Sequence, residues 1–228
     1  MTNEAYTVVI PAYNAATTIA AAVHSVLIQS VPPAAVIVVD DGSTDDTGTI
    51  AAGLDGPVRV IRQDNGGPGS ATTSGFGHVE TPLVATLDAD DLWLPEKMAA
   101  QLAALRADPG LAGVFGRIAT FRDKPALASY GSAYDGWSRT TMLARIDAVQ
   151  QTGPMRDPPG KVGEMIDWLA RMRENGAQLA MLPQVVALRR IHAGSLTHGK
   201  TSRLAPSYLQ VVRSAIERRR SRAGGESD

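Results

Sequence analysis

The stretch LVATLDADD, residues 83–91, places an apolar run directly before three aspartates. The run has the aliphatic side chains of a strand that is covered on both faces of a sheet. If the strand continues, alternation puts Asp88 and Asp90 on one side, at the carboxyl edge where open α/β sheets bind ligands. These carboxylates and Asp91 repel one another, and a hard divalent cation that joins them to a diphosphate relieves the repulsion. The stretch therefore predicts a Mg²⁺ or Mn²⁺ site, with an acidic turn before a helix at Pro95 as the alternative.

Length and composition indicate one ordinary globular domain. The chain has 228 residues, no cysteine, and 22 basic against 23 acidic side chains. Disulfide and thiolate chemistry are therefore excluded, and the balanced charge gives no reason to expect a nucleic-acid partner. No apolar stretch reaches the ~20 residues that span a bilayer, and the N-terminus has no signal-peptide pattern. We expect a cytoplasmic protein with no transmembrane segment.

Strands and helices alternate through the first half of the chain. The predicted strands are residues 6–10, 36–39, 58–61 and 83–87, and the predicted helices are 17–29, 45–54, a small-residue helix ending near Val79, and 95–106. Such alternation predicts an α/β fold with a mostly parallel central sheet and helices on both faces.

The pattern is weaker in the second half. We expect a strand around Val114, a loop or lid at 117–137, a strand at 140–144, helices at 147–152 and 164–174, and a strand at 185–191. One domain, residues 1–205, would consist of a first half at about 5–110 and a second half at about 111–200. An amphipathic helix and a disordered polar tail would follow at 206–228.

The stretch GSLTHGKT, residues 194–201, matches the complete P-loop pattern. A P-loop needs a buried strand before it and a helix directly after it. Arg189 and Arg190 are unfavourable in a central strand, and Pro206 delays the next helix. A P-loop NTPase therefore stays an alternative to the interpretation that follows.

Four ordered motifs resemble those of the family-two inverting glycosyltransferases, which have the GT-A fold. They are IPAYN at 10–14, VVDDGSTD at 38–45, NGG at 65–67 and LDADD at 87–91. A looser likeness continues through 163–171 and 190–192, so it extends over residues 5 to 200. The resemblance implies a single Rossmann-like GT-A domain that binds a nucleotide-diphosphate sugar, with a UDP-sugar as the expected donor and Mn²⁺ or Mg²⁺ as the cofactor. It also implies that the half at about 5–110 is the nucleotide-binding half and that the half at about 111–200 is the acceptor half.

The resemblance also implies roles for individual residues. Asp90 would be the main metal ligand, Asp88 would face the ribose beside the metal, and His192 would complete the metal site, although an ordinary histidine at a strand end is an equal alternative for His192. The complete set implied for nucleotide-sugar binding is Pro11, Ala12, Tyr13, Asn14, Asp40, Asp41, Gly67, Asp88, Ala89, Asp90 and Trp93.

The chain departs from the family pattern at two places. Thr72 and Thr73 replace an Arg-Asn pair that often helps to hold the nucleotide. Glu164 is followed by Met165 where the family often has Glu-Asp, so the usual aspartate base is missing. Glu164 and Asp167 are the remaining base candidates; we favour Glu164 for its register, because a solvent-side ion pair with Arg171 would account for Asp167.

The sequence therefore predicts a metal-dependent, inverting, hexosyltransferase-like glycosyltransferase with Glu164 or Asp167 as its base. The acceptor could be a small molecule, a glycan or a peptide. A nucleotidyltransferase would use similar carboxylates but would cleave at the α-phosphate. A degenerate nucleotide-sugar-binding protein without turnover is an alternative from a different class.

Overall fold

Nine strands form one mixed sheet in the part of the chain that the computed structural model describes, residues 4–122, 130, 132–158, 163–191 and 218. The strands are β1 (Tyr6–Ala12), β2 (Ala35–Asp40), β3 (Val58–Arg62), β4 (Leu83–Thr86), β5 (Leu92–Trp93), β6 (Leu111–Phe121), β7 (Ala133–Asp135), β8 (Leu143–Arg145) and β9 (Gln178–Arg190). Their order is β3-β2-β1-β4-β8-β6-β9-β5, and β7 pairs with β6. Six of the nine strands point the same way, and β5, β7 and β8 are antiparallel to these six.

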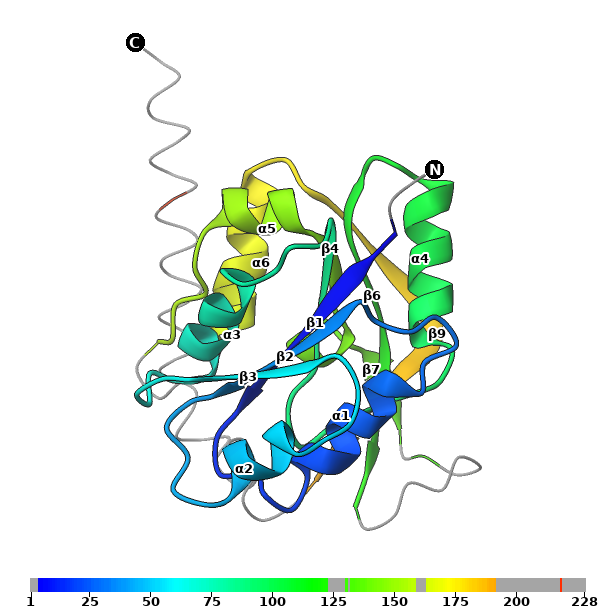
Figure 1. The fold of residues 1–228 in the computed structure, drawn as a ribbon. Helices are drawn as coiled ribbons and strands as arrows, with labels where there is room; N and C mark the ends of the chain where they lie inside the picture. The colour runs from blue at the N-terminus through cyan, green and yellow to red at the C-terminus, as the bar shows by residue number, and fades with distance from the viewer. Residues whose placement is uncertain (1–3, 123–129, 131, 159–162, 192–217, 219–228) are drawn as a thin grey trace.

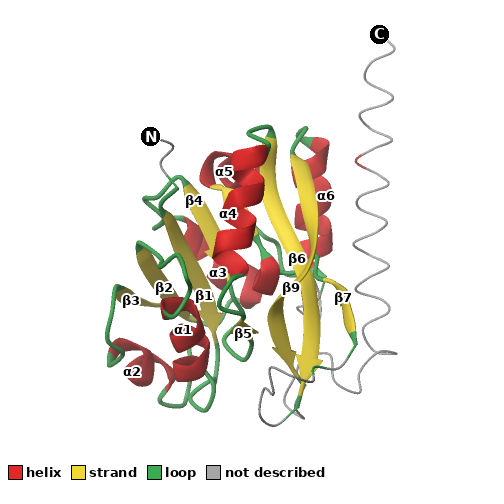
Figure 2. Ribbon diagram, turned by 90° about the vertical axis from the view of Figure 1, so that its right-hand side faces the viewer, coloured by secondary structure: helices red, strands yellow, loops and turns green. Residues whose placement is uncertain are grey.

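Helices cover both faces of this sheet (Figures 1 and 2). One layer contains α1 (Ile19–Leu27), α2 (Thr47–Ala52) and α4 (Lys97–Ala107), and the other contains α3 (Pro68–Phe76), α5 (Ile146–Thr152) and α6 (Glu164–Glu174). A 3₁₀ helix, η1 (Arg139–Thr141), leads into β8. The arrangement confirms the predicted α/β class. None of the described helices is both long enough and apolar enough to cross a membrane.

The alternation of side chains along β1 creates the two layers. Val8 and Ile10 belong to the apolar cluster under α1 and α4, whereas Val9 belongs to the cluster under α3 and α6. Every residue of β1 is buried. A strand that is covered on both faces must be apolar at consecutive positions, which is what the sequence of β1 provides.

The connections reverse direction beside β1. The chain passes from β1 through α1 to β2 on one side, and later from β3 through α3 to β4 on the other side of β1. The carboxyl ends of β1, β2 and β4 therefore surround a topological switch point. Ligands of doubly wound sheets bind outside the strands at such a point.

Several predictions for the second half are wrong in detail. β6 continues to Phe121, into the stretch predicted as a loop, and pairs in parallel with β9, which begins at Gln178 rather than at residue 185. Irregular pairing near Gly116 and Arg117 interrupts the alternation that would have revealed these strands. The strand predicted at 140–144 is instead η1 followed by the short β8. The P-loop pattern at 194–201 and the predicted C-terminal helix lie outside the described residues.

We expect Gly75→Ala to lower the free energy of unfolding by about 1–3 kcal/mol, because α3 packs closely on β1 at this residue. A Cβ on Gly75 would lie 2.3 Å from Val9 Cγ1 and 3.2 Å from Val39 Cγ2. The control is Gly53→Ala, where the nearest neighbour would be 3.6 Å away. Urea unfolding measures both variants, and equal stabilities would contradict this account of the packing.

Candidate active site

The three aspartates that follow β4 lie in a turn. β4 ends at Thr86, and the N–H of Asp91 donates to the carbonyl oxygen of Asp88 at 3.1 Å. The predicted alternation of Asp88 and Asp90 required a strand that continues to these residues, and this condition is not met. The turn itself gathers the carboxylates, since the charges of Asp90 and Asp88 both act on Asp91.

Asp91 is buried beneath this turn. Its carboxylate accepts hydrogen bonds from Thr140 Oγ1 at 2.7 Å and from the N–H of Arg190 at 2.8 Å. Burial raises the pKa of Asp91 well above its usual range, and the charges of Asp90 and Asp88 raise it further. Asp91 therefore joins the turn to η1 and β9 rather than facing a ligand.

An arginine that sequence analysis did not identify connects two of the predicted site carboxylates. Arg139 Nε donates to Asp88 Oδ1 at 2.8 Å, and Arg139 Nη1 donates to Glu164 Oε1. Burial opposes the charged form of Arg139, but the charges of Asp88 and Glu164 and their hydrogen bonds outweigh it and raise the pKa of Arg139. The end of β4 and the start of α6 thus meet at one guanidinium.

Only Glu164 among the candidates on α6 reaches this point. Asp167 Oδ2 is 2.9 Å from Arg171 Nε, and Asp167 Oδ1 is 2.8 Å from Arg218 Nη1. The predicted pair of Asp167 with Arg171 is present, but it is buried rather than solvent-exposed. Met165, in the register of the usual aspartate, packs in the apolar cluster that contains Trp168.

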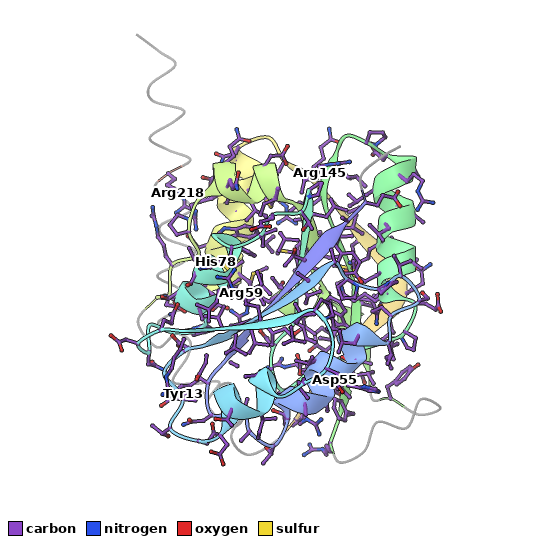
Figure 3. All side chains as sticks on the ribbon, in the orientation of Figure 1. Tyr13, Asp55, Arg59, His78, Arg145 and Arg218 are labelled. Carbon is purple, nitrogen blue, oxygen red and sulfur yellow. The ribbon has the colours of Figure 1, made fainter. Side chains whose placement is uncertain are left out.

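The carboxyl ends of β1 and β2 form one edge. Ala12 pairs with Asp40, which is 1% exposed and accepts the N–H of Ser43 at 2.9 Å. Asn14, at a φ of 48°, donates its N–H to Ser43 Oγ at 3.0 Å. Tyr13 lies between them at the carboxyl end of β1 and is 52% exposed (Figure 3). Its ring is therefore available to a ligand at this edge.

Asp41 holds the glycine loop. Its Oδ1 accepts the N–H of Gly66 at 2.9 Å and Gln63 Nε2 at 2.8 Å, and its Oδ2 accepts the N–H of Gly67 at 2.9 Å. Nearly all of its acceptor capacity is used within the protein. Asp41 and Gly67 therefore shape the loop, and their contact with a nucleotide stays a prediction.

A second carboxylate closes the same loop from the other side. Asp157 Oδ1 accepts the N–H of Gly69 at 2.9 Å, and Oδ2 accepts the N–H of Ser70 at 2.8 Å. These two N–H groups lie in the first turn of α3 and have no partner within the helix, and a negative charge is favoured at this end of a helix. Gly67 has a φ of 101°, and a Cβ there would lie 2.9 Å from Asp157 Cγ. Only glycine fits this approach.

The threonines that replace the Arg-Asn pair serve the fold. Thr72 Oγ1 donates to the carbonyl of Pro68 at 2.7 Å. Thr73 Oγ1 donates to the carbonyl of Gly69 at 2.9 Å and accepts the N–H of Met155, also at 2.9 Å. Thr73, one of the two residues that depart from the family pattern, thus holds the loop before α6. The remaining predicted nucleotide contacts, Pro11, Ala89 and Trp93, are buried.

The acidic turn can contribute ligands to a divalent cation but does not form a complete site. Among the described residues, no group of three or more His, Cys, Asp or Glu side chains could hold a metal ion. Mg²⁺ sites in nucleotide enzymes use one or two carboxylates, and phosphate and water supply the other oxygens. Asp88 keeps 29% of its side chain exposed, and Asp90 is partly exposed, so these two carboxylates fit the protein part of such a Mg²⁺ site. His192 lies outside the described residues.

The strand order, the switch point and the acidic turn after β4 define a domain of the GT-A class. The family described as "Glycosyl transferase family 2" matches residues 7–165. The chain belongs to this family, which confirms the resemblance of its motifs.

The curated relatives are longer proteins. The succinoglycan biosynthesis protein ExoU of Rhizobium meliloti is 32% identical over 202 residues, which cover 77% of this chain and 58% of ExoU. The succinoglycan biosynthesis protein ExoO of the same organism is 42% identical over 94 residues, which cover 40% of this chain and 27% of ExoO. The chain thus spans little more than half of ExoU and less than a third of the ExoO sequence.

Two solved structures share the fold. S. aureus TarS 1-349 in complex with UDP-GlcNAc has a TM-score of 0.72 at 18% identity, with 92% of this chain and 65% of that chain covered. The mannosyltransferase PcManGT from Pyrobaculum calidifontis, in complex with GDP-Man and Mn²⁺, has a TM-score of 0.72 at 19% identity, with 93% and 64% covered. Both confirm the fold.

We expect Asp91→Ala to lower the free energy of unfolding by about 1–3 kcal/mol, because the buried Thr140 hydroxyl and the N–H of Arg190 lose their acceptor. Asp91→Asn keeps an acceptor and removes the ionisable group. Because the pKa of Asp91 is raised in the folded state, the free energy of unfolding of the wild type falls as the pH rises. Above about pH 4 the free energy of unfolding of Asp91→Asn should therefore increase relative to that of the wild type.

Urea unfolding from pH 4 to 8 in EDTA measures these differences for Asp91→Ala and Asp91→Asn. A gap between Asp91→Asn and the wild type that does not change with pH would contradict the account of Asp91.

Proposed function

We propose that the chain transfers a sugar from a nucleotide-diphosphate sugar to an acceptor hydroxyl, with inversion at the anomeric carbon and with Mn²⁺ or Mg²⁺ as cofactor. The observation that carries the proposal is the meeting of Asp88 and Glu164 at Arg139, beside the switch point of a GT-A sheet. One carboxylate comes from the strand ends, where donors bind in this class of fold, and the other comes from the acceptor half.

The donor side would use the edge formed by β1, β2 and β4. Tyr13 would stack against the nucleotide base, and the rigid turn at Asp40 would position the ribose. Asp90 and Asp88 would hold the cation, which when bound neutralises the leaving diphosphate. The GDP-Man and Mn²⁺ in the PcManGT structure and the UDP-GlcNAc in the TarS structure support this choice of donor and cofactor.

Glu164 would be the base. It takes the proton of the acceptor hydroxyl, the acceptor oxygen bonds to the anomeric carbon, and the bond from that carbon to the diphosphate oxygen breaks on the opposite side. A nucleoside diphosphate leaves, and no covalent enzyme intermediate is needed. The burial of Met165 and the pairing of Asp167 with two arginines both support Glu164.

A binding protein without turnover is the second candidate, and the absence of an aspartate at Met165 favours it. The distinguishing test incubates the chain with UDP-GlcNAc, GDP-Man and other nucleotide sugars in Mn²⁺ and measures the products. We expect release of nucleoside diphosphate that EDTA abolishes. Binding without release would identify the non-catalytic alternative, and products cut at the α-phosphate would indicate a nucleotidyltransferase.

Asp90→Ala should abolish the Mn²⁺-dependent binding of UDP or GDP, because the main ligand of the cation is lost. The apo variant should be at least as stable as the wild type, since one charge leaves a like-charged cluster. Asp55→Ala is the control, because Asp55 is exposed in the loop before β3 (Figure 3). Titration calorimetry decides, and unchanged Mn²⁺-dependent affinity in Asp90→Ala would exclude this metal site.

Glu164→Gln should lower turnover by about 10²–10⁴ while leaving nucleoside-diphosphate affinity unchanged, because glutamine keeps an oxygen for Arg139 but takes up no proton. Asp167→Asn should keep its turnover and melt at a lower temperature, since Arg171 and Arg218 lose their anionic partner. Donor hydrolysis and thermal melting measure the two effects. The reverse pattern would identify Asp167 as the base.

A further inference from the structure

The backbone that carries Arg139 is fixed by side chains from three other elements. The carbonyls of four consecutive residues, 139 to 142, each accept a hydrogen bond from a side chain of β4, β5 or α4. The donors, in that order, are Thr86 Oγ1 (2.6 Å), Trp93 Nε1 (2.8 Å), Gln101 Nε2 (2.7 Å) and Lys97 Nζ (3.5 Å). Any rotation of η1 would leave buried acceptors unpaired, which is costly. The Cα of Arg139 is therefore held firmly.

The side chain of Arg139 is fixed as well. Its exposed fraction is 10%, and different nitrogens of the guanidinium bind Asp88 and Glu164. A planar guanidinium directs its N–H groups along set directions, unlike an ammonium. The position of the Glu164 carboxylate is thus defined relative to Asp88.

Stability alone explains this arrangement poorly. A buried ion pair is weak evidence of stabilisation, because desolvation offsets much of the attraction and apolar side chains often serve as well. Here one arginine holds two carboxylates, one from each half of the domain, at the strand edge where a ligand is expected. Precise support of that kind is what an active-site group requires.

We propose that Arg139 is a positioning residue. It holds the Glu164 carboxylate in the orientation in which this carboxylate takes the acceptor proton, and its hydrogen bond to Asp88 fixes that orientation relative to the donor side. This inference rests on the proposed function, because it needs Glu164 as the base. Arg139 acts through Glu164 and does not touch the substrate. Its loss therefore lowers kcat and leaves donor affinity nearly unchanged.

The experiment combines Arg139→Gln, Glu164→Gln and the double variant, with Arg145→Gln as a matched control. Arg145 donates to the backbone carbonyls of Leu111 and Pro109 and pairs with Leu83 at the start of β4. It therefore lies at the opposite end of the sheet from Tyr13 (Figure 3). Hydrolysis of UDP-GlcNAc and GDP-Man in Mn²⁺ gives kcat and KM, and calorimetry with UDP or GDP gives Kd.

Arg139→Gln should lower kcat by about 10- to 100-fold, with KM and Kd within about threefold of the wild type. The double variant should be no slower than Glu164→Gln alone, because the two residues act as one unit. Arg145→Gln should keep the wild-type kcat. Losses that multiply in the double variant would overturn the proposal, and so would a large rise in KM at unchanged kcat, which would mean that Arg139 binds the donor.

Arg139→Lys tests the proposal if Arg139→Gln does not fold. It keeps a positive charge between the carboxylates, so the protein should fold, but an ammonium does not hold two carboxylates in the geometry of a guanidinium, and kcat should still fall. Full activity in Arg139→Lys would overturn the positioning role. If Glu164→Gln keeps wild-type turnover, Glu164 is not the base and the positioning role of Arg139 fails with it, whereas the proposed function itself fails only if the wild-type protein releases no nucleoside diphosphate from a nucleotide sugar.

Discussion

The structure depends on the burial of β1 on both faces. A strand that packs helices on each side carries no charged group along its length, because a buried unpaired charge costs several kcal/mol. The same holds for β4. The hydroxyl groups within these two strands, at Tyr6, Thr7 and Thr86, are hydrogen-bonded inside the protein, and the polar side chains that can face a ligand, Tyr13, Asn14 and Asp88, come after the strands end. Since β1, β2 and β4 are parallel, these polar groups converge on one edge. The core thus determines where binding and chemistry can occur.

Convergence brings negative charges together, and the protein neutralises each one differently. Backbone N–H groups of the glycine loop bind Asp41, and those of α3 bind Asp157. Arg139 serves Asp88 and Glu164 together. Three carboxyl groups remain close together in the turn after β4, where burial raises the pKa of Asp91 and the charges of Asp90 and Asp88 raise it further. Because the surrounding carboxylates already have partners within the protein, the acidic turn is suited to a cation that enters together with its ligand.

The sequence predicted what local pattern encodes. The strand at β4, its three aspartates and the helix that begins at Glu164 follow from periodicity and from short motifs. Arg139 could not be predicted, because it lies in an irregular stretch and its partners are 51 and 25 residues away. The pairing of β6 with β9 was missed because bulges break the alternation that a strand prediction uses. Long-range contacts between irregular segments leave no periodic signal.

The replacement at Met165 and the presence of Arg139 have one physical explanation. Successive residues of an α-helix point about 100° apart, so a carboxylate at 164 and one at 165 reach different places. In this structure position 165 faces the apolar layer with Trp168, where a carboxylate would be buried without a partner. Glu164 faces the strand ends instead, but as the first residue of α6 it lacks the support of a preceding helical turn. The guanidinium of Arg139 supplies that support, so the proposed role of Glu164 as the base depends on an arginine on η1.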